Sequence, residues 1–181
     1  MFNETLEIDD KDQVIMSILQ ANPDASQLEI AKSVGLSQPS VGMRVLKLKR
    51  KGIISTSVGM NFRKVKLFLA KVDVQSNDTE KVIKSFDRCP FFLNGMIVSG
   101  ADNLCMFFMS PDMVVLEGVI NYHLRQHPNI QNVKMEIVIS PIKDFIFPVS
   151  LCEPNIKGKK EFKERCTHCP FRKALYSEKE I

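Results

Sequence analysis

The C-terminal part of the sequence holds the residues best suited to metal chemistry. Cys166 and Cys169 form a Cys-x-x-Cys pair, and this spacing places two thiolates on one tight turn within reach of a single metal centre. Cys152 lies in the same segment and can supply a third ligand. Three cysteines, the last followed by Pro170, fit an iron–sulfur cluster, with zinc as the alternative cofactor. The sequence therefore predicts a metal site at Cys152, Cys166 and Cys169.

Other uses of the cysteines stay open. The fourth ligand of a cluster can be Cys89, Cys105 or a group other than cysteine, although the apolar surroundings of Cys89 and Cys105 favour core thiols. His168 would complete a zinc site only under strain, because it is adjacent to Cys169. The Cys-x-x-Cys pair can also form a redox switch without metal. The chain has five cysteines, and an odd number argues against a closed disulfide framework.

A second candidate for chemistry is a block of positive charge. Residues 30–72 contain no Asp or Glu. The basic residues of this block are Lys32, Arg44, Lys47, Lys49, Arg50, Lys51, Arg63, Lys64, Lys66 and Lys71. On a folded surface, a block of one sign attracts polyanions such as nucleic acid.

Three short helices must position this charge. A first helix is predicted after Asp9, and it ends before Pro23 because the residue preceding a proline is disfavoured in the α region. Ser26 and Glu29 have the spacing of a capping box for a second helix. Gly35 is placed to end that helix. The apolar residues of both helices recur at helical spacing and predict a shared core.

The third helix carries the candidate contacts to DNA. Ser37 is its expected cap, and Val41, Val45 and Leu48 recur at helical spacing and should face the core. Two short helices joined through a glycine turn, the second of them basic, form the pattern of a helix-turn-helix. The second helix of that motif enters the major groove of double-stranded DNA.

Different roles are expected for the polar residues of the third helix. Gln38 and Ser40 have short polar groups suited to base edges, and Arg44 suits either guanine or phosphate. The remaining basic residues are expected to hold phosphates, which supply affinity without sequence information. The predicted DNA-binding residues are Ser37, Gln38, Ser40, Arg44, Lys47, Lys49, Arg50 and Lys51.

The middle of the sequence predicts a small sheet with two helices. A cap at Ser110 is expected to start the second helix, with Val114 on its apolar side. Strands are predicted at residues 65–72, 91–99, 104–109 and 133–139, and the first helix at residues 79–86. The order βαββαβ is that of the ferredoxin-like pattern. Two helices cover one face of such a sheet, so we expect the other face to pair with a second copy in a homodimer.

The expected fold class is therefore α+β. A winged helix-turn-helix domain is followed by a ferredoxin-like domain for dimerisation and effector binding. The predicted boundaries are 1–54 for the DNA-binding domain, 55–64 for a linker, 65–142 for the ferredoxin-like domain and 143–181 for a Cys-containing C-terminal extension.

Four segments resemble one known family in order and spacing. They are Ile-Asp-Asp-Lys-Asp at residues 8–12, the turn segment 29–37, the third helix through Gly-Ile-Ile at 41–54, and Ser-Gly-Ala-Asp-Asn at 99–103. Residues 6–142 thus resemble the Lrp/AsnC (leucine-responsive, feast/famine) transcriptional regulators. The resemblance implies a sequence-specific DNA-binding regulator that assembles as a dimer, tetramer or octamer.

The resemblance also implies an effector, often an amino acid, near the hairpin turn of the middle domain. Gly100, Ala101 and Asp102 match that region by position. The Asp102 carboxylate can pair with the ammonium group of an amino acid. The alternative is that Gly100 and Asp102 only shape a tight turn. The regulator is therefore expected to respond either to a small molecule or to the redox or metal state of its C-terminal cysteines.

Composition and motifs argue against other classes of protein. No apolar run approaches the roughly 20 residues that span a bilayer, and the first residues lack the layout of a signal peptide, so a cytoplasmic protein without membrane contact is expected. His123, His127 and His168 form no nucleophile–base constellation, which argues against an enzyme. His123 and His127 are instead predicted to be a solvent-facing pair. The alternative function is a ligand- or metal-sensing module without DNA binding, which the basic Arg44 and Lys47 disfavour.

Overall fold

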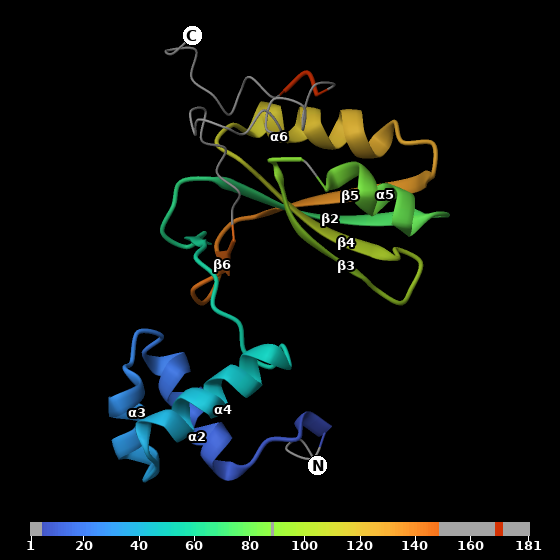
Figure 1. Cartoon of the computed structure of the whole chain (residues 1–181). Coiled ribbons are helices and arrows are strands. Elements are labelled where there is room, and N and C mark those ends of the chain that lie inside the picture. The colour runs from blue at the N-terminus through green and yellow to red at the C-terminus, as the bar shows by residue number, and fades with distance from the viewer. Residues whose placement is uncertain (1–4, 88, 149–168, 172–181) are drawn as a thin grey trace, which may run out of the picture. The chain divides into compact units, whose positions relative to one another are not determined.

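The computed structural model of the chain describes residues 5–87, 89–148 and 169–171 (Figure 1). The chain divides into two compact units, Met1–Ser57 and Val58–Ile181. Of the predicted metal ligands, Cys152 and Cys166 lie outside the described residues, whereas Cys169 lies within them. In the described part of the chain, no helix is long and apolar enough to cross a membrane.

The first unit consists of three short helices around one core. Each helix contributes buried apolar side chains, and Ile15, Ile30, Ala31 and Val41 form the centre of this core. The helices are α2 (Asp10–Ala21), α3 (Gln27–Val34) and α4 (Gln38–Arg50). The predicted helix-turn-helix arrangement of α3 and α4 is confirmed.

Side-chain caps start each of these helices. Ser26 and Glu29 exchange side chain–backbone hydrogen bonds in the predicted capping box of α3. The Ser37 hydroxyl accepts a hydrogen bond from the first turn of α4, as expected. At α2, Asp9 and Asp12 form a further capping box that the sequence analysis did not identify. The caps satisfy N–H groups that have no partner within a helix.

The turn between α3 and α4 depends on a glycine. Gly35 has a φ of 64°, in the left-handed region that residues with a Cβ atom rarely adopt. The Leu36 N–H then donates to the Ala31 carbonyl oxygen at 3.1 Å. This sharp turn sets the direction in which α4 leaves α3.

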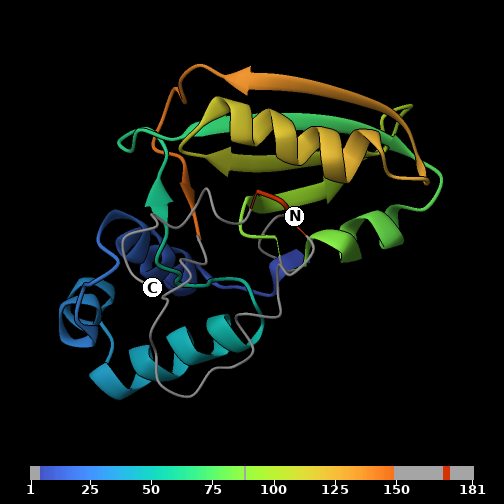
Figure 2. The ribbon, with the colours of Figure 1, turned by 90° about the horizontal axis from the view of Figure 1, so that it is seen from above.

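The second unit is built on a four-stranded antiparallel sheet in the order β3-β4-β2-β5. Helices α5 and α6 cover one face of it (Figures 1 and 2), and Phe86, Phe108 and Leu116 are buried between helices and sheet. The elements are β2 (Phe68–Ser76), α5 (Thr79–Phe86), β3 (Phe92–Ile97), β4 (Leu104–Ser110), α6 (Met113–Ile120) and β5 (Ile130–Val138). This order confirms the predicted α+β, ferredoxin-like fold.

The opposite face of the sheet is partly covered by the chain itself. Two short strands, β1 (Met60–Asn61) and β6 (Ile146–Phe147), pair antiparallel. Phe62 follows β1 and packs in one cluster with Leu69 of β2. Part of the segment predicted as a linker, residues 55–64, therefore packs within the second unit.

The rest of this face carries charge. Lys71 Nζ forms ion pairs with Asp73 and Glu136, and the pair with Glu136 measures 3.1 Å. Lys134 Nζ lies 2.9 Å from the same Glu136 carboxylate. Hydrogen bonds to Asp73 and Glu136 raise the pKa of Lys71. The uncovered part of the face is thus a lattice of alternating charges across β2 and β5.

The predicted start of the second helix of this unit is wrong. Asp112 caps α6, and its carboxylate accepts from the N–H groups of Val114 and Val115 at 2.7 and 3.2 Å. The Ser110 hydroxyl accepts from the Asp112 N–H at 3.1 Å and is not the cap. Val114, predicted on the apolar side, is 79% exposed.

Candidate nucleic-acid interface

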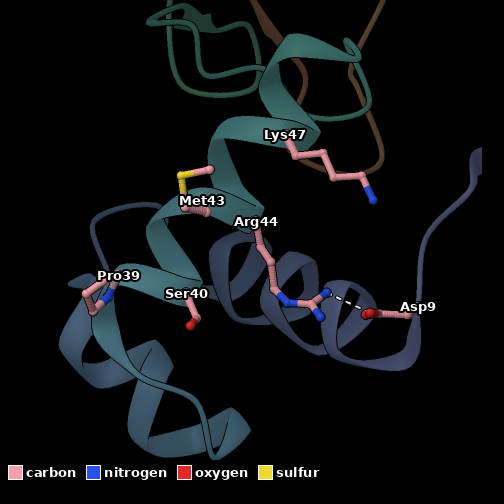
Figure 3. A pocket seen from close by; sticks show the side chains of 6 residues that line it. All are labelled: Asp9, Pro39, Ser40, Met43, Arg44 and Lys47. Carbon is pink, nitrogen blue, oxygen red and sulfur yellow. Dashed lines mark hydrogen bonds and ion pairs between the residues drawn. The ribbon is translucent and has the colours of Figure 1, made fainter.

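Helix α4 has one buried side and one exposed side. Val41 and Leu48 are fully buried on the core side. On another side, α4 residues and Asp9 line an open hollow, with the Arg44 side chain reaching toward Asp9 (Figure 3). The lining residues are Asp9, Pro39, Ser40, Met43, Arg44 and Lys47. A partner can therefore reach α4 without disturbing the core.

Nearly all of the predicted DNA-binding residues are accessible. Arg44 is half-buried, and the other residues of the predicted set are exposed. The Ser37 hydroxyl lies 2.8 Å from the Ser40 hydroxyl and also caps the helix. Gln38 stands beside them in the first turn of α4. The structure thus brings the candidates for base contact together at the N-terminus of the helix.

The basic residues near the end of α4 differ in how they are paired. Lys51 forms an ion pair with Glu7, and a hydrogen bond from Lys51 lowers the pKa of that exposed carboxyl. Of the basic residues near the end of α4, Lys47, Lys49 and Arg50 form no ion pair with any described residue. These three are the ones left available to an external anion.

Arg44 is bound internally to two carboxylates. Its Nη1 lies 2.7 Å from Asp9 Oδ2 and 2.7 Å from Asp12 Oδ1. The Asp12 side chain is only 2% exposed, so Arg44 is the cation that offsets the cost of burying this carboxylate. A hydrogen bond from the Asp12 N–H, together with Arg44, lowers the pKa of Asp9. Arg44 therefore ties the middle of α4 to the start of α2.

The candidate effector residues lie in the turn between β3 and β4. Gly100 has a φ of 136°, which a residue with a side chain would adopt only under strain. Gly100 and Ala101 are exposed and Asp102 is half-buried. Asn103 fastens the turn to the end of β2, because its side chain accepts from the Ser76 N–H at 2.9 Å and donates to the Ser76 carbonyl at 2.7 Å. No local sequence pattern indicates this role of Asn103, because its partner Ser76 lies 27 residues away.

His123 and Cys169 meet on the helix side of the second unit. His123 Nε2 lies 3.4 Å from Cys169 Sγ, and Cys169 is 7% exposed. The His123 ring also packs edge-on against Phe86, and burial lowers the pKa of the imidazole. The predicted solvent-facing pair of His123 and His127 is therefore wrong for His123, which faces the protein.

The other described cysteines behave as core thiols. Cys105 is buried, and this burial raises the pKa of its thiol. Cys89 is half-buried and packs against the main core of the second unit. Among the residues that the structure describes, no group of three or more His, Cys, Asp or Glu is placed to hold a metal ion. Of the predicted ligands Cys152, Cys166 and Cys169, only Cys169 is among the described residues.

Comparison with known proteins connects both units to transcriptional regulators. The family model for winged helix-turn-helix DNA-binding domains matches residues 8–55. The chain is 25% identical over 140 residues to the HTH-type transcriptional regulator LrpA of Pyrococcus horikoshii, covering 75% of this chain and 99% of LrpA. It is 27% identical over 130 residues to the regulatory protein AsnC of Haemophilus influenzae, covering 69% and 87%.

The fold of both units also recurs in solved structures. The transcriptional regulator NMB0573 of Neisseria meningitidis, solved as a complex with L-Met, superposes with a TM-score of 0.67 at 22% identity. The match covers 75% of this chain and 92% of that protein. Because this share is larger than either unit, the match includes parts of both.

Proposed function

We infer that this chain, which belongs to the Lrp/AsnC family of DNA-binding transcriptional regulators, places α4 in the major groove of double-stranded DNA. The two-sided character of α4 carries this inference. Val41 and Leu48 anchor one side in the core, while polar and basic side chains on the other side stay exposed. The relatives are regulators and not enzymes, so no catalytic step is assigned to this site.

The residues of α4 divide into three roles. Gln38 and Ser40 lie at the N-terminal end of the helix, where helix-turn-helix proteins contact base edges. Lys47, Lys49 and Arg50 are free of ion pairs among the described residues and hold phosphates. Arg44 is committed to Asp9 and Asp12, so it positions α4 and does not contact bases directly.

Replacing Gln38 tests the assignment of base contacts. Gln38→Ala is expected to relax the preference at one base pair by about 1–3 kcal/mol and to leave binding to nonspecific duplex unchanged. Competition between a selected duplex and its single-base variants measures the preference. The matched control is Gln20→Ala, an exposed glutamine on α2. An unchanged preference at every position of the Gln38 variant would remove this residue from the interface.

We also propose that two copies pair through the partly open face of the sheet. The segments around β1 and β6 leave the charged lattice of Lys71, Asp73, Lys134 and Glu136 uncovered. A two-fold axis over this lattice can bring a cation of one copy against an anion of the other. The family resemblance also favours an even-numbered assembly. Two helix-turn-helix units would then contact two half-sites on DNA.

The effector proposed for the 98–103 turn is an amino acid. The relative from Neisseria meningitidis was solved with L-Met, and the half-buried Asp102 carboxylate of this chain is suited to an ammonium group. Gly100 lets the backbone approach a ligand closely. The alternative is that the turn has a purely structural role, since Gly100 and Asn103 already shape and hold it.

Sedimentation of the full chain with and without L-methionine tests pairing and effector together. A dimer or larger even assembly is expected at micromolar concentration. L-methionine is expected to shift its mass distribution in the wild type and not in Asp102→Asn. A monomer under all conditions would contradict the pairing. If wild type and Asp102→Asn responded equally to L-methionine, the turn would have only a structural role.

A further inference from the structure

The pair formed by Cys169 and His123 is not explained by DNA recognition. Both residues belong to the second unit, and no part of α4 is involved. Cys169 is one of the described residues in the C-terminal segment, and it is buried rather than exposed. It joins the main core cluster around α5, α6 and the sheet. A cysteine 46 residues further along the chain than His123 is thus held against its ring nitrogen.

Two features of the polypeptide lie next to this contact. The helix continues into a π-helical turn, η1 (Asn121–Arg125), which carries His123. Single π-helical turns are uncommon and occur frequently at functional sites. One turn earlier, Gly118 lies under the Phe171 ring, and a Cβ atom at Gly118 would be 2.4 Å from Phe171 Cε1. The absence of a side chain at Gly118 therefore lets the segment 169–171 lie on the helix.

The distance between the two side chains fits a shared tetrahedral ion. Zinc binds imidazole nitrogen at about 2.0 Å and thiolate sulfur at about 2.3 Å, which puts the two ligand atoms about 3.5 Å apart at the tetrahedral angle. The observed separation of His123 Nε2 and Cys169 Sγ is 3.4 Å. One nitrogen and one sulfur on a single centre are typical of zinc, whereas clusters of iron and sulfur are most often held by cysteine alone.

We propose that His123 Nε2 and Cys169 Sγ are two ligands of one zinc ion that fastens the C-terminal segment to α6. Binding converts the Cys169 thiol to a thiolate and releases its proton to solvent. The sequence predicts Cys152 and Cys166 as further ligands, and both lie outside the described residues. The histidine ligand of this site is His123, which the fold brings to Cys169 from another part of the chain. It takes the place of His168, the histidine considered from the sequence.

Metal titration of the full chain tests the site. Protein stripped with a chelator is titrated with Zn²⁺, and with Co²⁺ as a spectroscopic probe. The expected result is one bound ion per chain, with a thiolate-to-cobalt charge-transfer band and the strong visible bands of tetrahedral Co²⁺. Cys169→Ser should weaken the charge-transfer band. Removal of an outer-shell partner lowers metal affinity by roughly 10- to 100-fold. His123→Ala should weaken the affinity for Zn²⁺ by more than this.

The matched control is His127→Asn, which changes the next histidine along the chain. His127 Nδ1 accepts from the Asn129 N–H, a bond that an asparagine oxygen can replace, so zinc affinity should stay at the wild-type value. His123→Gln serves as a second variant if His123→Ala fails to fold. Binding to nonspecific duplex, which needs neither residue, separates a failure of this site from a failure of the proposed DNA-binding function.

Three results would overturn the proposal. Equal zinc affinity in wild type and His123→Ala would exclude His123 as a ligand. Absence of Zn²⁺ and Co²⁺ binding would leave a thiol–imidazole hydrogen bond only. The third result is iron with a cluster chromophore in anaerobically purified protein. If His123→Ala retained this chromophore, the iron–sulfur alternative held by cysteines would be favoured.

Discussion

Arg44→Ala is expected to destabilise the helix-turn-helix unit by about 3 kcal/mol, because the change leaves the buried Asp12 carboxylate without its cation. A loss of this size corresponds to roughly 100-fold lower protection of amides in α2 and α4 against hydrogen exchange. Hydrogen exchange of the full chain, followed by mass spectrometry, measures the effect in that unit. DNA binding should fall with it, for specific and nonspecific duplexes alike.

Two further variants separate a positioning role of Arg44 from direct contact with DNA. Arg50→Ala removes the same charge from an exposed position of α4, and amide protection should stay unchanged. Arg44→Met combined with Asp12→Leu removes both charges of the buried pair and should recover part of the lost stability. If Arg44→Ala kept full protection and lost only its preference among base pairs, Arg44 would be a base contact, as the sequence pattern also allowed.

Replacing Lys47, Lys49 and Arg50 together by Ala is expected to weaken DNA binding by roughly 100-fold at physiological salt. Each phosphate contact contributes about −0.9 to the slope of log affinity against log salt, so the slope should become less negative by about 2.7. Stability should change little, since the three side chains are exposed and form no ion pair with the described residues. Fluorescence anisotropy over a series of salt concentrations measures both quantities.

A charge-matched control distinguishes direct contact from a general loss of positive charge. Lys81, Lys84 and Lys143 are exposed lysines of the second unit, and replacing all three by Ala gives the same change in net charge. This control should keep nearly the wild-type slope. Equal slopes in the two triple variants would mean that α4 makes no phosphate contacts of its own.

Much of the helix-turn-helix was predictable because its signals are local. The Ser26–Glu29 capping box, the Ser37 cap and the turn at Gly35 each depend on residues within a few positions of one another. Such short-range hydrogen bonds and steric limits act in the same way in most folds. The order of strands and helices in the second unit followed from alternating and helical periodicity for the same reason.

The contacts most important for the proposed functions could not be predicted from short-range sequence patterns. Arg44 meets Asp9 and Asp12 across 35 and 32 residues, so helical spacing alone predicted a free, DNA-facing cation. His123 was placed in solvent because its pairing with Cys169 arises only when the C-terminal segment packs on α6. At α6, the local pattern predicted Ser110 as the cap, whereas hydrogen bonding in the fold makes Asp112 the cap.

Selection of DNA sequences by the full chain from a random duplex pool tests whether α4 recognises a specific DNA sequence. We expect a two-fold symmetric motif whose half-sites lie about 10–10.5 base pairs apart, or a multiple of that spacing, because two α4 helices of a dimer enter successive major grooves. Gln38→Ala should alter the motif at the same position in both halves. A pool with no enriched motif would contradict sequence-specific binding by α4 and would favour a sensing module that does not bind DNA.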